Sequence, residues 1–415
     1  MTPEPPAERP APFRIGLLGH GTVGAAFHAL LEERAEAVEA AAGRRPEIVG
    51  VLTRSRGDAR DIVERSDLVV ELMGGTEPAR EYVLAAMRAG RHVVTANKQL
   101  LSQHGEELYA AAHEHGVQLR FEAAVGGVVP VVRVIHETLA AAHIDRVHGI
   151  VNGTTNFILS EMARTGASYE QVLGEAQELG YAEADPSDDV SGRDAAAKMA
   201  ILARLAFGAR ISLEDVPHEG IEDVTSDDIA YARELGLSLK LVGSAERAGD
   251  GIAVRVYPTF LYARHPLASV GGAFNAVTVE SAAITEITLS GPGAGGSQTA
   301  SAVLGDVISA MIPPPSRLAT PARDLPLVTD VESGFYLHLD VADRPGVLAQ
   351  VAEILGLQGV SVKSVVQNGL GEGARLVMVM HPVLESRFEA AVTLISRLDF
   401  VRSRPRAIRV IEESF

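Results

Sequence analysis

Three glycines spaced over six residues stand between a short apolar run and a long amphipathic segment. They form the motif Gly19-His20-Gly21-Thr22-Val23-Gly24. Phe13 to Leu18 predicts a strand, and Thr22 to Ala42 predicts a helix. In this setting the first glycine permits a tight turn, the second lets the backbone approach a pyrophosphate, and the third allows close helix–strand packing. The pattern predicts a nicotinamide-dinucleotide-binding domain, the alternative being an ordinary strand–helix turn.

The rest of the chain predicts an α/β protein of three domains. Further strands at 48–53, 67–73, 91–95 and 118–121 alternate with helices, which indicates a Rossmann-type parallel sheet covered on both faces. Longer helices and later strands predict an α+β substrate-binding and dimerisation domain, and the pattern after 334 predicts a small βαββαβ module. We expect a disordered tail at 1–12, the dinucleotide domain at 13–132 plus 297–312, the second domain at 133–296, a proline-rich linker at 313–333 and the last domain at 334–415.

Composition narrows the class of function. The 415 residues carry a net charge of −17 and contain no cysteine. A strongly acidic chain is a poor partner for nucleic acid or anionic membranes, and the missing thiols exclude disulfides and a cysteine nucleophile. No apolar stretch approaches the ~20 residues of a membrane span, and the first residues lack a signal peptide's apolar core. We expect a cytoplasmic protein.

The tip of the second strand bears on the choice of dinucleotide. An acidic residue there favours NAD, whereas this strand ends in Thr53-Arg54-Ser55-Arg56. Because arginine can pair with a 2′-phosphate, Arg54 favours NADP, with NAD still possible. The alternative is a solvated surface arginine.

Several polar segments are candidates for chemistry. Lys98 follows a strand at the carboxyl edge of the sheet, where active-site groups of such folds collect. Glu122 precedes a glycine-rich stretch whose carbonyls could hold a hard cation, although on the sequence alone a tight domain crossover is the stronger interpretation. Asn152-Gly153-Thr154-Thr155-Asn156 could hydrogen-bond an amino acid or a nicotinamide, the alternative being a turn and a helix cap. The glycine-rich segment 290–296 is either a second backbone cradle or a hinge.

The segment from Ala176 to Lys198 carries the strongest signal. Gly180 stops a helix, acidic residues crowd the following loop, and Asp194 opens a helix with Lys198 four residues later. That spacing places the two side chains on one helix face, which continues into Ile201, Leu202 and Leu205. A lysine beside such an apolar stripe is partly desolvated, which suits proton transfer. The alternative is a surface ion pair.

These motifs, in this order, resemble homoserine dehydrogenase over about 13–313. The residues that carry the resemblance are the glycine loop, Ala96-Asn97-Lys98, the Asn152 cluster and the signature within 176–198: Ala176, Gly180-Tyr181-Ala182, Asp185-Pro186, Asp189-Val190, Gly192, Asp194 and Lys198. The resemblance implies reversible, NAD(P)-dependent interconversion of L-homoserine and L-aspartate 4-semialdehyde, in threonine, methionine and isoleucine biosynthesis. Because no kinase-like segment precedes residue 13, we expect a monofunctional enzyme.

The resemblance also implies roles for individual residues. Lys198 would donate the proton to the forming alkoxide, and Lys98 would touch cofactor and substrate and share in proton transfer. Glu183 and Asp194 would bind the amino-acid end of the substrate or orient its neighbours. The glycine loop, Thr76, Gly180 and Gly295 would line the dinucleotide. A structural monovalent cation, sodium, would be held by Glu122 and the carbonyls of Val125, Gly127 and Val129. The segment Arg54 to Arg65 is short and suggests a trimmed loop.

The last domain resembles an ACT domain. The motif Asp340-Val341-Ala342-Asp343-Arg344-Pro345-Gly346-Val347-Leu348 matches its strand-to-helix junction, and the glycine exposes backbone N–H groups suited to a ligand carboxylate. The resemblance implies feedback inhibition by L-threonine held at Asp343, Arg344, Gly346, Val347 and Leu348. An oligomerisation module without a ligand is the alternative. Because ACT modules pair, we expect a homodimer or homotetramer.

Two other functions compete with this hypothesis. A dehydrogenase of another amino-acid-derived aldehyde would keep the dinucleotide domain but not the signature around Lys198. A non-catalytic amino-acid sensor would have lost Asp194 and Lys198, and both are present.

Overall fold

The computed structural model describes residues 10–293, 295–312, 323–369 and 373–411, and these divide into two compact units. The first unit comprises Met1–His143, Ala200–Asp215 and Leu289–Asp324, and the second comprises Ile144–Met199, Val216–Thr288 and Leu325–Phe415. Most of the predicted tail and residues 313–322 of the predicted linker lie outside the described residues. No helix in the described part is both long enough and apolar enough to span a bilayer.

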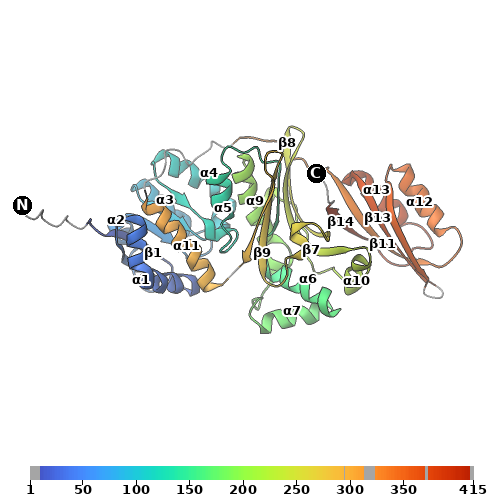
Figure 1. Ribbon diagram of the computed structural model, residues 1–415, viewed down its shortest axis with the longest axis horizontal. Coiled ribbons are helices and arrows are strands. Elements are labelled where there is room, and N and C mark those ends of the chain that lie inside the picture. The colour runs from blue at the N-terminus through green and yellow to red at the C-terminus, as the bar shows by residue number, and fades with distance from the viewer. Residues whose placement is uncertain (1–9, 294, 313–322, 370–372, 412–415) are drawn as a thin grey trace, which may run out of the picture. The chain divides into compact units, whose positions relative to one another are not determined.

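A five-stranded parallel sheet forms the centre of the first unit (Figure 1). Its strand order is β2-β1-β3-β4-β5, so the chain reverses direction across the sheet between β1 and β3. Such a switch point opens a crevice at the carboxyl ends of the strands, where dinucleotides bind. The strands are β1 (Phe13–Leu18), β2 (Pro46–Leu52), β3 (Leu68–Glu71), β4 (His92–Thr95) and β5 (Leu119–Arg120).

Helices cover this sheet, and α1 and α11 share one core with β1 and β3. Phe27, Val303 and Val307 pack there against Ile15 and Leu68, all fully buried. The helices are α1 (Thr22–Ala42), α2 (Ala59–Arg65), α3 (Ala79–Arg88), α4 (Lys98–Glu114) and α11 (Gly296–Met311), with the short turns η1 (Glu122–Ala124), α5 (Val131–Arg133) and η2 (Val134–Thr138). The helix α2 corrects one expectation, because half of the segment expected to be a trimmed loop is helical, with Asp58 as its side-chain cap.

The second unit is built on a nine-stranded sheet of order β10-β9-β6-β7-β8-β14-β11-β13-β12. Its first part pairs antiparallel strands β6 (Arg146–Ile150), β7 (Leu237–Ala248), β8 (Gly251–Tyr262), β9 (Phe274–Ser281) and β10 (Thr285–Pro292). The helical segments between these strands in the sequence are α6 (Gly153–Thr165), α7 (Tyr169–Glu178), α8 (Ser187–Val190), α9 (Arg193–Phe207), η3 (Leu213–Asp215), α10 (Ser226–Glu234) and η4 (Pro266–Ser269). Of these, η3 and the part of α9 from Ala200 onward belong to the first unit.

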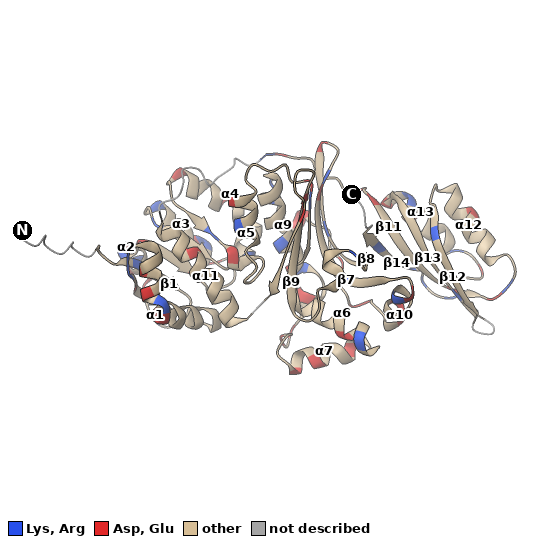
Figure 2. Cartoon of the chain, in the orientation of Figure 1, with Lys and Arg blue, Asp and Glu red and all other residues tan. Residues whose placement is uncertain are grey.

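Amphipathic spacing explains why α7 forms where it does. Ser168 and Gln171 make a capping box at its start, and Val172 and Ala176 face the core. Its exposed positions include the acids Glu170, Glu175 and Glu178, and Figure 2 shows acidic residues along this helix in red. The charged face keeps this helix at the surface while its apolar face packs against α6.

The C-terminal part has the predicted βαββαβ order. It consists of β11 (Glu332–Ala342), α12 (Val347–Leu357), β12 (Val362–Gly369), β13 (Gly373–Leu384), α13 (Glu385–Ile395) and β14 (Arg406–Ile411). Phe335 and Phe388 stack at its centre, with ring centroids 3.9 Å apart. The strand β14 also pairs in parallel with β8, for example Val410 with Phe260, so this module continues the larger sheet.

Candidate active site

The glycine loop has the geometry that its three glycines predict. Gly19 has a φ of +100°, and a Cβ there would lie 2.5 Å from the carbonyl oxygen of Leu72. A Cβ on Gly24 would lie 2.2 Å from the carbonyl oxygen of Gly19, so only glycine lets α1 start so close to β1. Nothing lies within 4 Å of a Cβ built on Gly21. No side chain caps the start of α1 at Gly21. An uncapped helix start of this kind suits a phosphate group.

Two further segments border this loop. After β2, the hydroxyl of Thr53 accepts hydrogen bonds from the amides of Ser55 and Arg56, which makes a tight turn and leaves Arg54 exposed. At the start of α11, a Cβ on Gly296 would lie 3.3 Å from Thr22 Cγ2, so this helix begins beside the start of α1. Its N-cap is Gly295, with a φ of +140°. His20, at the loop's exposed edge, contacts His28 at a ring distance of 5.5 Å.

Lys98 is the first residue of α4 and is half-buried. Asn97 caps this helix, since its Oδ1 accepts from the amide of Leu100 at 3.0 Å. Thr76, also half-buried, lies in the loop after β3. The sequence analysis missed two fully buried polar residues, Glu71 at the end of β3 and Thr95 at the end of β4, which are hydrogen-bonded to each other at 2.6 Å. The acidic residue at the end of an apolar strand was the signal that could have identified Glu71.

The second unit brings Lys198 and Asp194 together as their spacing predicts. Lys198 Nζ donates to Asp194 Oδ2 at 2.8 Å and to the carbonyl oxygen of Val151 at 2.7 Å. The side chain of Lys198 is 13% exposed and that of Asp194 only 2%. Ile201 and Leu202, farther along this helix, are buried, as the apolar stripe predicts.

Asn152 completes this cluster, and it was not among the predicted site residues. Its Nδ2 donates to Asp194 Oδ2 at 2.9 Å and to Asp189 Oδ1 at 2.7 Å, while its Oδ1 caps α6. Asp194 therefore accepts two donors on one oxygen, which fixes the carboxylate and holds the lysine. The polar cluster around Asn152 was visible in the sequence. Its hydrogen bond to Asp194 was not predictable, because the two residues lie 42 positions apart.

The other predicted substrate and dinucleotide residues of this unit lie on the loop after α7. Gly180 is exposed and has a φ of +76°, which ends the helix. Glu183 is exposed, and its backbone carbonyl accepts from Gln177 Nε2 at 3.2 Å. Thr154 of α6 donates to the carbonyl oxygen of Tyr181 at 2.7 Å, which fastens the loop to the Asn152 cluster. The exposed carboxylate of Glu183 therefore lies on a loop that is hydrogen-bonded to α6.

Glu122 lies in a buried, oxygen-rich turn of the first unit. Its two carboxylate oxygens accept from the amides of Val132 and Arg133 at 2.7 and 2.9 Å, and its own amide donates to Asp306. Burial raises the pKa of Glu122 to about 7, opposed by the two amide hydrogen bonds and reinforced by the Asp306 charge. Burial likewise raises the pKa of Asp306 to about 6.

The carbonyl groups next to Glu122 are crowded. Val125 and Val129 are buried, and the carbonyl oxygen of Val129 accepts from the amide of Val131. A Cβ on Gly127 would lie 2.2 Å from the carbonyl oxygen of Gly293. The guanidinium of Arg133 also lies 3.7 Å from Asp306 Oδ1. Carboxylate and carbonyl oxygens such as those in this turn are the ligands that alkali and alkaline-earth cations prefer.

In the C-terminal module, the predicted effector residues lie around the start of α12. Gly346 is its N-cap, with a φ of +89°. Arg344 forms an ion pair with Asp399 and lies over the ring of Phe400. Asp343 and Leu348 are exposed, and Val347 is buried. The helix start is therefore accessible and lacks a side-chain cap.

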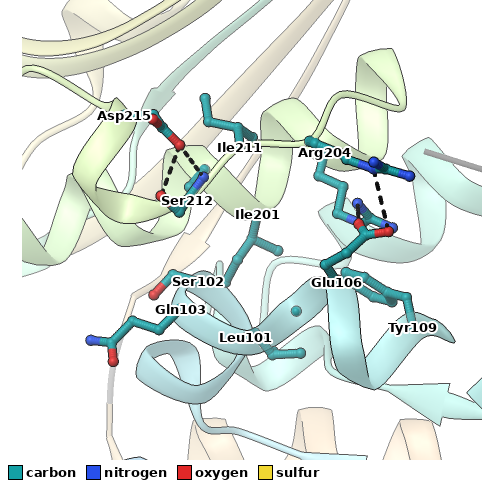
Figure 3. A pocket seen from close by; sticks show the side chains of 13 residues that line it. Leu101, Ser102, Gln103, Glu106, Tyr109, Ile201, Arg204, Ile211, Ser212 and Asp215 are labelled. Carbon is teal, nitrogen blue, oxygen red and sulfur yellow. Dashed lines mark hydrogen bonds and ion pairs between the residues drawn. The ribbon is translucent and has the colours of Figure 1, made fainter. Parts of the chain in front are cut away.

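A separate cavity of about 240 Å³ lies in the first unit, between α4 and the segment 200–215 (Figure 3). Arg204 spans it, donating to Glu106 at 2.6 Å and lying over the ring of Tyr109. Asp215 accepts from Ser212 at the opposite side. None of the predicted site residues lines this cavity.

Comparison with known proteins agrees with this arrangement. Residues 19–122 match the family model of the homoserine dehydrogenase NAD binding domain, residues 130–308 match homoserine dehydrogenase, and residues 336–400 match the ACT domain. Homoserine dehydrogenases of Synechocystis and Corynebacterium glutamicum are each 42% identical, over 96% and 95% of this chain and 99% and 95% of theirs.

Solved structures give the same result. A homoserine dehydrogenase from Thiobacillus denitrificans superimposes with a TM-score of 0.92 at 40% identity, covering 97% of this chain and 98% of that one. A hyperthermophilic archaeal homoserine dehydrogenase in complex with NADPH has a TM-score of 0.62 at 27% identity, covering 72% of this chain and 97% of that one. The chain therefore belongs to the homoserine dehydrogenase family, NAD(P)-dependent oxidoreductases that act on CH–OH groups.

Proposed function

We propose that this chain interconverts L-homoserine and L-aspartate 4-semialdehyde, with Lys198 as the proton donor to the forming alkoxide. The observation that carries the proposal is the hydrogen bonding of its ammonium group. An ammonium has three N–H donors, and among the described residues two of them bond to Val151 and Asp194. The third remains for a substrate oxygen, at a side chain that is already largely desolvated.

Asp194 and Asn152 act through Lys198. The negative charge of Asp194 keeps the ammonium in place, and Asn152 prevents the carboxylate from rotating away. In the reverse direction Lys198 accepts the hydroxyl proton of homoserine. Glu183 supplies a carboxylate for the substrate's ammonium group from the exposed loop after α7, whereas Asp194, whose side chain is almost fully buried, orients its neighbours.

The cofactor of this proposal is NADP, with NAD as the weaker partner. When bound, the nicotinamide exchanges a hydride with the substrate carbon. The open N-terminus of α1 at His20 to Val23 would hold the pyrophosphate, and Arg54, exposed beyond β2, would pair with the 2′-phosphate. Thr76, Gly180 and Gly295 would line the dinucleotide. Lys98 would contact cofactor and substrate and share in proton transfer.

A monovalent cation, sodium, fits the Glu122 turn. Two buried carboxylates with raised pKa values are more easily ionised beside a cation. Glu122 and the carbonyls of Val125, Gly127 and Val129 would be its ligands. Such an ion would stabilise the turn and takes no part in proton transfer.

Regulation and assembly complete the proposal. L-Threonine would bind at the start of α12, its carboxylate facing the free amides after Gly346, with Asp343 and Arg344 beside it. A homodimer or homotetramer is proposed because ACT modules pair, and the edge strand β12 is exposed for such pairing.

The substitution Lys198→Ala tests the central role. We expect homoserine oxidation to fall by about 10²–10⁴-fold, because general acid–base groups contribute that much, while the dinucleotide affinity measured by fluorescence titration changes little. Lys98→Ala is the parallel variant, and circular dichroism checks that both fold. If Lys198→Ala keeps more than about a tenth of the rate, Lys198 is not the sole proton donor and Lys98 takes its place.

A further inference from the structure

We propose that Glu71 is a positioning residue, which with Thr95 couples the loop after β3 to the helix start that carries Lys98. The inference rests on the proposed function, in which Thr76 of that loop and Lys98 meet the cofactor. Glu71 ends β3 and Thr95 ends the neighbouring strand β4, where the two residues pair in register. Both are fully buried, so neither touches substrate.

On one side, Glu71 holds the loop after β3. Its Oε1 accepts from the amide of Met73 at 2.7 Å, and the amide of Gly74 also bonds to the carboxylate. Gly74 and Gly75 both have positive φ values, near +78° and +72°. A loop with two such glycines has little stiffness of its own. The carboxylate therefore supplies anchoring that the loop's own residues lack.

On the other side, Glu71 reaches the start of α4 through Thr95. Thr95 Oγ1 donates to Glu71 Oε2 at 2.6 Å and accepts from the amide of Asn97 at 3.0 Å. Asn97 then caps α4 through Leu100 and donates from Nδ2 to the carbonyl oxygen of Gly75 at 2.5 Å. The chain of bonds closes on the loop after β3, so the loop and Lys98 share one support.

The bonding pattern requires the ionised carboxylate. The Met73 and Gly74 amides, the Thr95 hydroxyl and the Asn97 side chain all donate to Glu71. Burial raises the pKa of Glu71, and these four hydrogen bonds oppose the rise. An amide at this position would turn an N–H group toward a donor, so Glu71→Gln breaks the support without changing the shape.

The hydroxyl of Thr95 offers a matched pair of variants. Thr95→Val keeps the shape and removes both hydrogen bonds, whereas Thr95→Ser keeps the hydroxyl. A third variant, Val93→Ala, opens a cavity at another fully buried position of β4 without touching the network. Val93→Ala shows how far a loss of stability alone, with the hydrogen bonds of Glu71 and Thr95 intact, changes the kinetics.

The experiment compares kcat, KM for homoserine, and dinucleotide Kd for the full-length variants. We expect Thr95→Val and Glu71→Gln to lower kcat/KM by about tenfold or more, because small misplacements of reacting groups are costly, and to weaken dinucleotide binding. Thr95→Ser should stay near the parent chain, as should Val93→Ala below its unfolding temperature.

Two outcomes overturn the inference. One is a folded Thr95→Val variant with the kinetics and dinucleotide affinity of the parent chain. The other is Thr95→Ser or Val93→Ala losing as much activity as Thr95→Val. Absence of homoserine oxidation in the parent chain would instead refute the proposed function, and the dinucleotide Kd of the variants would still test the coupling.

Discussion

Lysine is rare in this chain, and each lysine has a distinct environment. The four are Lys98, Lys198, Lys240 and Lys363. Lys240 is buried in β7 and donates to Asn156 Oδ1, Ser160 Oγ and the carbonyl oxygen of Val270 at 3.1, 3.2 and 2.6 Å. All three acceptors are neutral. The ammonium is thus hydrogen-bonded without a counter-charge among these partners, and burial lowers its pKa to about 8.

This lysine predicts a pH dependence of stability. Because its folded pKa of about 8 lies below the 10.5 of an unperturbed lysine, the unfolded chain keeps the proton where the folded chain has released it. The free energy of unfolding should therefore rise between about pH 8 and 10.5, by ~3 kcal/mol from this group. Urea denaturation of the parent chain and of Lys240→Met measures the difference.

Lys240→Met should lack that rise, since it has no titrating group at this position. Lys363→Met, at an exposed position, is the matched control and should show the same rise as the parent chain. Equal slopes for the parent chain and Lys240→Met would show that Lys240 is not responsible.

Contacts within one helix could be predicted from the sequence, whereas contacts between distant segments could not. Asp194 and Lys198 lie four residues apart on one helix, so their contact follows from helical geometry alone. Their partners Val151 and Asn152 precede them by more than forty residues, and no local pattern brings those segments together. Glu71 and Thr95 were overlooked because a polar residue within an apolar strand gives no sign of its partner.

At the level of elements, helices with clear signals were predicted closely. The bounds of α1 match the predicted range, because the glycine loop starts this helix, and α9 starts one residue before Asp194, where a helix start was predicted. The strands β6 and β7 were not predicted. The strand β6 is only five residues long and includes the buried His148, and β7 includes the buried Lys240. Tertiary burial on both faces overrides local propensity there.

The C-terminal module meets the first part of its unit through ionic contacts as well as through β14. Asp228 of α10 is buried and pairs with His338 of β11 at 3.1 Å and with Arg406 of β14 at 3.2 Å. Arg375 of β13 pairs with the neighbouring Asp227. A shift of these strands would therefore change the contacts of Asp227 and Asp228 and so reach α10.

These contacts lead to a prediction for L-threonine. Adding it at millimolar concentration should lower the rate of homoserine oxidation, because threonine at the proposed site would shift the strands that contact Asp228. Initial rates measured over a series of L-threonine concentrations test this inhibition. The enantiomer D-threonine is the control. A rate unchanged by L-threonine would leave the module without the proposed regulatory role.

On the scale of the whole molecule, the alternation of strands and helices correctly predicted the α/β class and the parallel dinucleotide-binding sheet. The C-terminal βαββαβ order was also correct. Sequence could not reveal that β14 joins β8, because parallel pairing between strands almost 150 residues apart has no local signature. Two compact units result, with the C-terminal module continuing the sheet of the second.

The initial rate of dinucleotide reduction by the purified chain with L-homoserine, measured separately with NADP and with NAD, tests the proposed function most directly. We expect a rate that depends on homoserine and is higher with NADP, and no rate with L-2-aminobutyrate, which lacks the hydroxyl group. A higher rate with NAD would contradict the role given to Arg54. No homoserine-dependent reduction with either dinucleotide would contradict the proposed function itself.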